Sequence, residues 1–335
     1  MRKYLLSEGG NFYKANLHCH STVSDAVLTP EELKKIYKDA GYSVLAFTDH
    51  DVLIPHPELN DGEFLTLNGY EFEIEDWGGK SLYRFVKAFH VCLIATEPDN
   101  LTQVCYHRTE YVGDNAVNYR DKVKYDENEP DFIRTYTPSC MNEVMRRARE
   151  NGFFVIYNHP TWSLEGYEDY MRYEHMHAME ICNWGSFNAG YPEYNEKEYD
   201  DMLRGGKRIF CIGADDTHDL DSACGAFTMI KAERLEYRDI TDALLRGDFY
   251  ASQGPLIHEL YFEDGKIHVS CSDACRIRIN TASRRTESVC GRDGEPVCRA
   301  SFEVIDDDGY VRITVVDERG RHANTNAYFV DELLN

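Results

Sequence analysis

Seven short apolar segments with strand-like composition recur along the chain, and each ends in or beside a polar side chain that can bind a metal ion. They span residues 13–20, 44–50, 64–71, 87–94, 153–159, 178–183 and 208–216. Helical patterns lie between several of them: one has a capping box at 29–32 and stops at Gly41, one runs from 137 to Gly152, and one covers 193–204. Strands that alternate with helices predict an α/β fold with a parallel sheet, and polar residues at strand ends predict the mouth of a barrel. Seven strands indicate an incomplete or distorted barrel.

Two stretches depart from this pattern. The polar stretch 96–136 is expected to be an insertion at the mouth, either as a lid or as a plain surface excursion. After Gly254-Pro255, short alternating segments are separated by turn sequences, which predicts a small β-sandwich-like domain. We therefore expect a barrel domain over 1–254 and an all-β domain over 255–335, the latter with a structural or interfacial role.

Charge and cysteine content narrow the class of protein. The chain of 335 residues carries 36 Lys and Arg against 59 Asp and Glu, a formal net charge of −23. Such a surface repels polyanions, so we expect a small-molecule substrate and no long nucleic acid as partner. No apolar run approaches the roughly 20 residues of a membrane span. The 11 cysteines include no CxxC pair, which favours reduced thiols. We expect a cytoplasmic protein without membrane association, whose oligomeric state is left open.

A pair of histidines in the first segment opens a series of metal-ligand residues. His18 and His20 are two residues apart, so on a strand their imidazoles point to the same side and can bind one ion. Alone, the pair is explained equally well as surface histidines. The ends of the other segments extend the set to His18, His20, Asp25, His50, Glu71, His90, His159, Asp216 and His218. Carboxylates crowd together only with a cation or a shifted pKa, so the set predicts a multinuclear metal centre.

These residues lie in motifs that resemble, in order, those of the PHP (polymerase and histidinol phosphatase) superfamily of metal-dependent phosphoesterases. The motifs are His18-Cys19-His20 with Asp25, Thr48-Asp49-His50, Gly69-Tyr70-Glu71, the histidine of Phe89-His90-Val91, Asn158-His159-Pro160, and Gly213-Ala214-Asp215-Asp216-Thr217-His218. The resemblance covers residues 16 to about 220 and implies a distorted (β/α)7 barrel. The segment 249–255, followed by a β-domain, is similar to a two-domain branch of the superfamily, some members of which hydrolyse carboxyl or carbamate esters.

The resemblance also implies how the ligands divide, with Glu71 as the bridge between two ions. The implied sets are His18, His20, Glu71 and Asp216 for one ion, Glu71, His90 and His159 for a second, and Asp25, His50 and His218 for a third. Two or three divalent ions are expected, and mixed imidazole and carboxylate ligands suit zinc, manganese or iron.

The function expected from these motifs is a metal-dependent phosphoesterase that acts on a small phosphorylated substrate. Two ions about 3.5–4 Å apart would generate a bridging hydroxide as nucleophile. His218, Asp25 and His50 are the expected catalytic residues, which assist the leaving group by proton transfer or through the third ion. The alternatives are a carboxyl-ester or carbamate hydrolase with the same ions, an amidohydrolase barrel, and a non-catalytic metal-binding module. The amidohydrolase is disfavoured because its usual bridging lysine does not end any expected strand.

Further residues have weaker predicted roles. Asp49 or Asp51 is expected to orient a ligand imidazole, as metal-bound histidines usually require, and Asn183 to touch substrate. Spacing to His218 favours Asp216 over Asp215 as the ligand. Surface or strand-structural roles are favoured for His56, His175, His177 and Glu180. Phosphate contacts from the insertion are open to Arg108, Arg120, Lys122 and Arg134.

Overall fold

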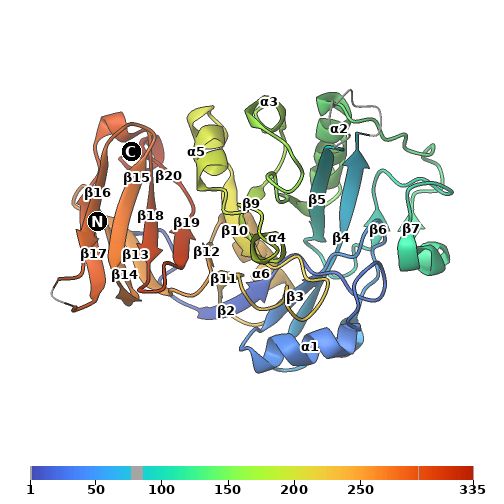
Figure 1. Ribbon diagram of the computed structural model, residues 1–335, viewed down its shortest axis with the longest axis horizontal. Helices are drawn as coiled ribbons and strands as arrows, with labels where there is room; N and C mark the ends of the chain where they lie inside the picture. The colour runs from blue at the N-terminus through green and yellow to red at the C-terminus, as the bar shows by residue number, and fades with distance from the viewer. Residues whose placement is uncertain (1, 77–85, 293, 335) are drawn as a thin grey trace.

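The computed structural model describes residues 2–76, 86–292 and 294–334 and shows a mixed α/β protein built on one large sheet (Figure 1). In order across it, the strands are β10 (Phe210–Ala214), β9 (Ala178–Asn183), β8 (Phe153–Tyr157), β5 (Ala88–Ala95), β4 (Leu65–Glu75), β3 (Val44–Phe47), β2 (Asn11–Asn16), β11 (Phe227–Ala232), β12 (Phe249–Ser252), β19 (His322–Thr325), β18 (Tyr310–Val316), β15 (Arg276–Thr281) and β16 (Thr286–Cys290), and β20 (Tyr328–Phe329) pairs with β18. The seven apolar segments expected to be strands are β2, β3, β4, β5, β8, β9 and β10.

Two smaller sheets complete the strand inventory of the described residues. The four-stranded sheet holds β1 (Lys3–Tyr4), β13 (Ile257–Glu263), β14 (Lys266–Ala274) and β17 (Val297–Glu303). The two-stranded sheet, β6 (Thr102–Gln103) and β7 (Lys124–Tyr125), lies in the insertion.

One expectation about the large sheet is wrong, because β5 runs antiparallel to both of its neighbours, β4 and β8. The pairs β2–β3, β3–β4, β8–β9 and β9–β10 are parallel as expected. Every residue of β5 is buried, and a strand buried on both faces shows the same apolar run in either direction. Because β5 is reversed, its start lies at the edge where the parallel strands end, which brings His90 to that edge.

Three of the helices in the described residues, Pro30–Asp39, Pro138–Glu150 and Glu196–Arg204, match the helical patterns expected from the sequence. The described helices are α1 (Pro30–Asp39), α2 (Pro138–Glu150), α3 (Tyr167–Tyr170), α4 (Trp184–Asn188), α5 (Glu196–Arg204), α6 (Tyr237–Arg246) and α7 (Val330–Leu333), with 3-10 turns at Pro57–Leu59, Asp114–Lys122 and Asp306–Asp308. Thr29 and Glu32 form the predicted capping box, and Gly41 and Gly152 adopt positive φ angles after α1 and α2. The helix expected from residue 193 starts at Glu196. None of the helices described here is long and apolar enough to cross a bilayer.

Strands that are distant in the order of the sheet share one core. Ala15 of β2, Ile156 of β8 and Ile212 of β10 belong to one buried cluster. The Thr228 hydroxyl of β11 donates a hydrogen bond to the Gly213 carbonyl of β10 over 2.9 Å. The sheet therefore curves until its β10 end lies beside β11. No strand pairing joins these two strands within the described residues, so the distorted (β/α)7 barrel stays a prediction.

The strands after residue 255 gather at one side of the molecule (Figure 1). The sheets nevertheless continue across the expected boundary. Strand β12 pairs with β19, with Tyr250 opposite Thr325, and β1 pairs with β13, with Lys3 opposite Phe262. The division into domains at 254/255 stays a prediction.

Candidate metal centre

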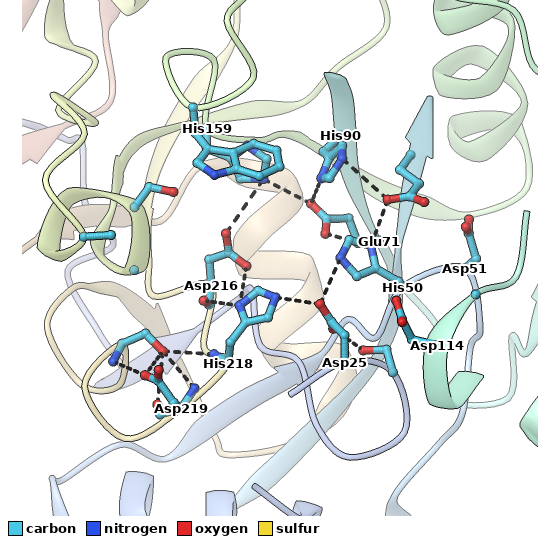
Figure 2. A pocket seen from close by; sticks show the side chains of 18 of the residues that line it. Asp25, His50, Asp51, Glu71, His90, Asp114, His159, Asp216, His218 and Asp219 are labelled. Carbon is cyan, nitrogen blue, oxygen red and sulfur yellow. Dashed lines mark hydrogen bonds and ion pairs between the residues drawn. The ribbon is translucent and has the colours of Figure 1, made fainter. Parts of the chain in front are cut away.

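The nine predicted ligand residues come together around one cavity of about 520 Å³. Those that line it are Asp25, His50, Glu71, His90, His159, Asp216 and His218, and Figure 2 shows them directed toward one another. The side chains of His18 and His20 are fully buried and contact Glu71. The structure thus places every residue of the predicted set in a single site.

Backbone hydrogen bonds between loops fix the site at the carboxyl edge of the sheet. The segment after β2 bonds to the segment after β10, because Asp216 N donates to His18 O over 3.0 Å and His20 N donates to Thr217 O over 3.1 Å. On the other side, Asp51 N donates to Glu71 O over 2.8 Å. Predicted ligands that are far apart in the sequence are therefore held at fixed relative positions by main-chain contacts.

The innermost part of the site is the first predicted set. His18 Nε2 lies 3.3 Å from Glu71 Oε1 and 3.2 Å from Asp216 Oδ1. His20 Nε2 lies 3.2 Å from both carboxylates, at Glu71 Oε2 and Asp216 Oδ1. The two Nε2 atoms face each other at 3.0 Å. Two nitrogens and two carboxylates converge here on one point, as the ligands of a single ion do.

The other predicted ligands surround this inner group. Glu71 Oε1 lies 3.2 Å from His90 Nδ1 and 3.3 Å from His159 Nε2. On the opposite side, Asp25 Oδ2 lies 3.1 Å from His218 Nε2 and 3.8 Å from His50 Nε2. Glu71 therefore occupies the central position that a bridging carboxylate needs.

The pKa values of the central carboxylates follow from these contacts. Burial alone would raise the pKa of Glu71, but imidazoles such as His18 and His90 lower it well below its usual range. Burial is likewise outweighed at Asp216, where His18 and His20 lower the pKa. Both groups are ionised and available as ligands.

Three buried atoms of the centre support the assignment to metal binding. His50 Nδ1, His90 Nε2 and Asp216 Oδ1 have no hydrogen-bond partner within the described structure. Buried polar atoms are normally paired, and imidazole nitrogens with carboxylate oxygens are ligands of zinc and other divalent ions. The donor set fits a bound divalent cation.

The carboxylate that orients a ligand is Glu180, which sequence reasoning had favoured as a surface or strand-structural residue. Glu180 is fully buried, and its Oε1 lies 2.8 Å from His18 Nδ1. Its Oε2 accepts hydrogen bonds from His159 N and Asn183 Nδ2, both over 2.9 Å. A carboxylate in this position fixes the tautomer and ring orientation of a metal-binding histidine.

The expectation that Asp49 or Asp51 orients a ligand imidazole is wrong, because neither carboxylate bonds to a histidine within the described residues. Asp49 accepts hydrogen bonds from Ser21 N and Ser24 N, which hold the loop after β2. Asp51 forms a buried ion pair with Arg134 over 2.6 Å. The side chains of both aspartates therefore bond to the surrounding loops.

The two adjacent aspartates after β10 have different roles. Asp216 lines the cavity, as spacing to His218 predicts. Asp215 is fully buried and accepts hydrogen bonds from Tyr37 and from the main-chain N–H groups of 224–226. Burial raises the pKa of Asp215 to about 6. Asn183 does not line the cavity and instead donates to Asp216 Oδ2 over 3.2 Å.

The remaining weaker candidates lie outside the cavity. His56 packs on Phe47, and His177 stacks on Phe154. His175 is exposed. The four basic residues proposed to contact phosphate, Arg108, Arg120, Lys122 and Arg134, are absent from the cavity lining of the described residues. The insertion does border the site, through Gly113 and Asp114, so its lid role stays a prediction.

Sequence reasoning missed several residues of the cavity wall. Acidic and aromatic residues among them include Glu73, Glu75, Asp114, Trp162 and Asp219. For Glu73 and Glu75 the signal was present, because residues two and four positions after Glu71 on a strand share its face.

No protein-family model matches the chain. A segment of 40 residues is 52% identical to a 5'-3' exoribonuclease of Haemophilus influenzae, and the match spans 12% of this chain and only 15% of that curated relative.

Three solved structures are similar to the chain at low identity. A two-domain protein from Bacteroides vulgatus, described as containing a predicted PHP-like metal-dependent phosphoesterase, is 16% identical with a TM-score of 0.43, covering 98% of this chain and 97% of that one. A candidate metal-dependent phosphoesterase from Bifidobacterium adolescentis is 15% identical with a TM-score of 0.40, over 71% of this chain and 98% of its own. An amidohydrolase from Chromobacterium violaceum, with bound sulfate and no metal, is 17% identical with a TM-score of 0.39, over 61% and 87%.

Proposed function

We propose that this protein is a metal-dependent hydrolase, and specifically a phosphoesterase that acts on a small phosphorylated substrate. The observation that carries the proposal is the convergence of nine imidazole and carboxylate side chains around one cavity. His18, His20, Glu71 and Asp216 would hold one divalent ion, and the other five residues one or two more. Zinc, manganese and iron suit these donors. A distorted (β/α)7 barrel that opens at this cavity is part of the proposal.

Residues of the chain have different roles in the proposed hydrolysis. Divalent ions, when bound, supply positive charge that stabilises a negatively charged transition state and makes a nearby water molecule more acidic. His218 lies at the mouth with its side chain 39% exposed, and Asp25 Oδ2 is 3.1 Å from its Nε2. With no ion bound to His218, Asp25 favours the protonated imidazole, so His218 can then hold a proton at Nε2 for the leaving group; with a third ion bound, His218 and Asp25 would be its ligands instead. Glu180 keeps His18 in place while this occurs.

The charge of the cavity bears on the kind of ester. Its described lining contains no lysine or arginine, and it includes Glu73, Glu75, Asp114 and Asp219 besides the predicted ligands. A phosphate group would therefore depend on bound cations for charge neutralisation. The same observation favours a second candidate, a carboxyl-ester or carbamate hydrolase, because such a substrate carries less negative charge at the reacting centre.

The test is hydrolysis of four matched p-nitrophenyl substrates by purified, metal-supplemented protein: a phosphate monoester, a phosphate diester, a carboxyl ester and a carbamate. Turnover of a phosphate ester that is lost in Glu71→Ala supports the phosphoesterase. Glu31→Ala, at an exposed glutamate of α1, is the control and should retain the rate. Turnover confined to the carboxyl ester or carbamate would favour the second candidate. Retention of full activity in Glu71→Ala would contradict both.

A further inference from the structure

Glu73 is an acidic residue that the resemblance does not place among the metal ligands. It lies two residues after Glu71 on β4, so the two side chains share one face of the strand. The antiparallel register of β4 and β5 puts Glu73 directly opposite His90. The reversed direction of β5 is what brings these two residues together.

Two imidazole nitrogens converge on the carboxylate of Glu73. Its Oε2 lies 3.5 Å from His50 Nδ1 and 3.6 Å from His90 Nε2. The ligand atoms of the three residues all lie within 4.8 Å of one another. Both nitrogens are buried and have no hydrogen-bond partner in the described residues. The distances are too long for hydrogen bonds with good geometry and suit side chains that surround a common ion.

The hydrogen bonds around His90 select which of its nitrogens binds metal. His90 Nδ1 lies 3.2 Å from Glu71 Oε1, and an N–H at Nδ1 can donate to this ionised carboxylate. A neutral imidazole with its proton on Nδ1 keeps a free lone pair on Nε2. That Nε2 is the atom that faces Glu73. The arrangement matches metal-binding histidines, which usually donate their other N–H to a carboxylate.

The nearest basic side chain leaves the Glu73 carboxylate free for this role. Arg134 donates to both oxygens of Asp51, over 2.6 and 3.0 Å, and to the main-chain carbonyl of Glu73 over 2.8 Å. In the part of the chain that the structure describes, no lysine or arginine forms an ion pair with the Glu73 side chain.

We propose that Glu73, His50 and His90 together bind one divalent cation at the outer end of the metal centre. The inference rests on the proposed function and changes two assignments within it, because His50 and His90 leave the ligand sets implied by the resemblance. Three protein ligands leave at least one position of a tetrahedral ion open, as in catalytic zinc sites. Glu73 is 32% exposed and lines the cavity, so the open position is accessible to substrate.

The test compares metal binding by wild type, Glu73→Gln and Glu75→Gln, with Mn²⁺ as the probe. Glutamine keeps the size and a hydrogen-bonding oxygen of glutamate but is a much weaker metal ligand, so a role in orienting imidazoles alone would survive the change. Glu75 lies on the same face of β4 and lines the same cavity, which makes it a matched control. Bound Mn²⁺ is counted by mass spectrometry of the dialysed protein, and affinity is measured by electron paramagnetic resonance titration.

We expect Glu73→Gln to lose one Mn²⁺ equivalent, or to bind its weakest equivalent at least about tenfold less tightly, while Glu75→Gln behaves as wild type. The visible spectrum of the Co²⁺-loaded protein should change in Glu73→Gln, because a ligand is replaced. Unaltered Mn²⁺ equivalents, affinity and Co²⁺ spectrum in Glu73→Gln would overturn the outer site. His20→Ala separates the two proposals, because it removes an inner ligand. Loss of metal there with no effect of Glu73→Gln would leave the proposed function standing, whereas full metal retention in His20→Ala would overturn both.

Discussion

Two regions of this protein each bury a glutamate carboxylate almost completely. The side chains that surround the carboxylate differ between them. In the metal centre, Glu71 is 1% exposed and faces imidazole nitrogens. In a second cluster, Glu165 is 7% exposed and accepts hydrogen bonds from the hydroxyls of Tyr136, Tyr157 and Tyr173. We call this second group the tyrosine cluster.

The difference shows in the pKa of each carboxylate. Burial raises the pKa of Glu165 to about 7, although three tyrosine hydroxyls donate to it. The pKa of Glu71 is lowered well below its usual range despite burial. Burial of a carboxylate is therefore no sign of a metal site by itself. A carboxylate satisfied by hydroxyl donors is structural, whereas Glu71 relies on positive charge beside it, supplied by protonated imidazoles or by a bound cation.

The largest expected effect that separates the two regions is stabilisation by metal. With a divalent ion at about 1,000-fold above its Kd, the free energy of unfolding should rise by about 4 kcal/mol relative to protein in chelator. Denaturant unfolding with and without metal measures the gain. Glu165→Gln should keep it and Glu71→Gln should lose most of it. An equal gain in Glu71→Gln would show that ions bind elsewhere.

The next prediction concerns Asp215, a buried carboxylate that accepts several hydrogen bonds close to the metal centre and is not expected to bind metal. Asp215→Ala should lower the free energy of unfolding by about 3 kcal/mol, because three main-chain N–H groups and the Tyr37 hydroxyl lose their acceptor. Metal equivalents should stay as in wild type. Loss of metal with no loss of stability would place Asp215 among the ligands.

A smaller effect concerns the pH dependence contributed by the tyrosine cluster. The folded pKa of Glu165, about 7, exceeds its usual value of 4.5, so the native state holds this proton more tightly than the unfolded state. Its stabilising contribution is full below pH 4.5 and is lost as pH rises through 7. Over that window, Glu165→Gln should remove a decline in the free energy of unfolding of roughly 2–3 kcal/mol. Urea unfolding at several pH values checks this, and identical pH profiles for variant and wild type would contradict it.

The smallest effect is expected from Glu180, the buried carboxylate that contacts His18. Glu180→Gln should weaken metal binding about tenfold, or about 1.4 kcal/mol. A glutamine side chain has only one acceptor oxygen. It therefore cannot replace both carboxylate oxygens of Glu180, one of which lies beside His18 while the other accepts from His159 N and Asn183. Isothermal titration with Mn²⁺ measures the change, and unaltered affinity would show that Glu180 serves packing alone.

Local pattern was enough to find the side chains that come together at the site, because His18, His20 and His50 directly follow apolar strands and histidine is a metal-binding residue type. The direction of β5 was hidden, since an entirely buried strand has no polar face to orient it. The sequence places Glu73 on the same strand face as Glu71, but its position opposite His90 depends on the register of the paired strands.

The tyrosine cluster shows a second limit. Glu165 meets Tyr136 across 29 positions of sequence, and nothing near either residue signals the contact. Glu180 was undervalued for the same reason, because its partner His18 lies 162 positions away. Long-range pairs of this kind are set by the topology of the sheet.

Exposure rises steadily from the closed end of the metal centre to its mouth. The side chain of His18 is 0% exposed, that of His50 is 21% exposed and that of His218 is 39% exposed. An ion that reaches His18 must pass the outer imidazoles, and an ion that leaves must pass them again. For ions bound as proposed, a chelator should therefore remove an ion at the mouth first and the ion held by His18 last.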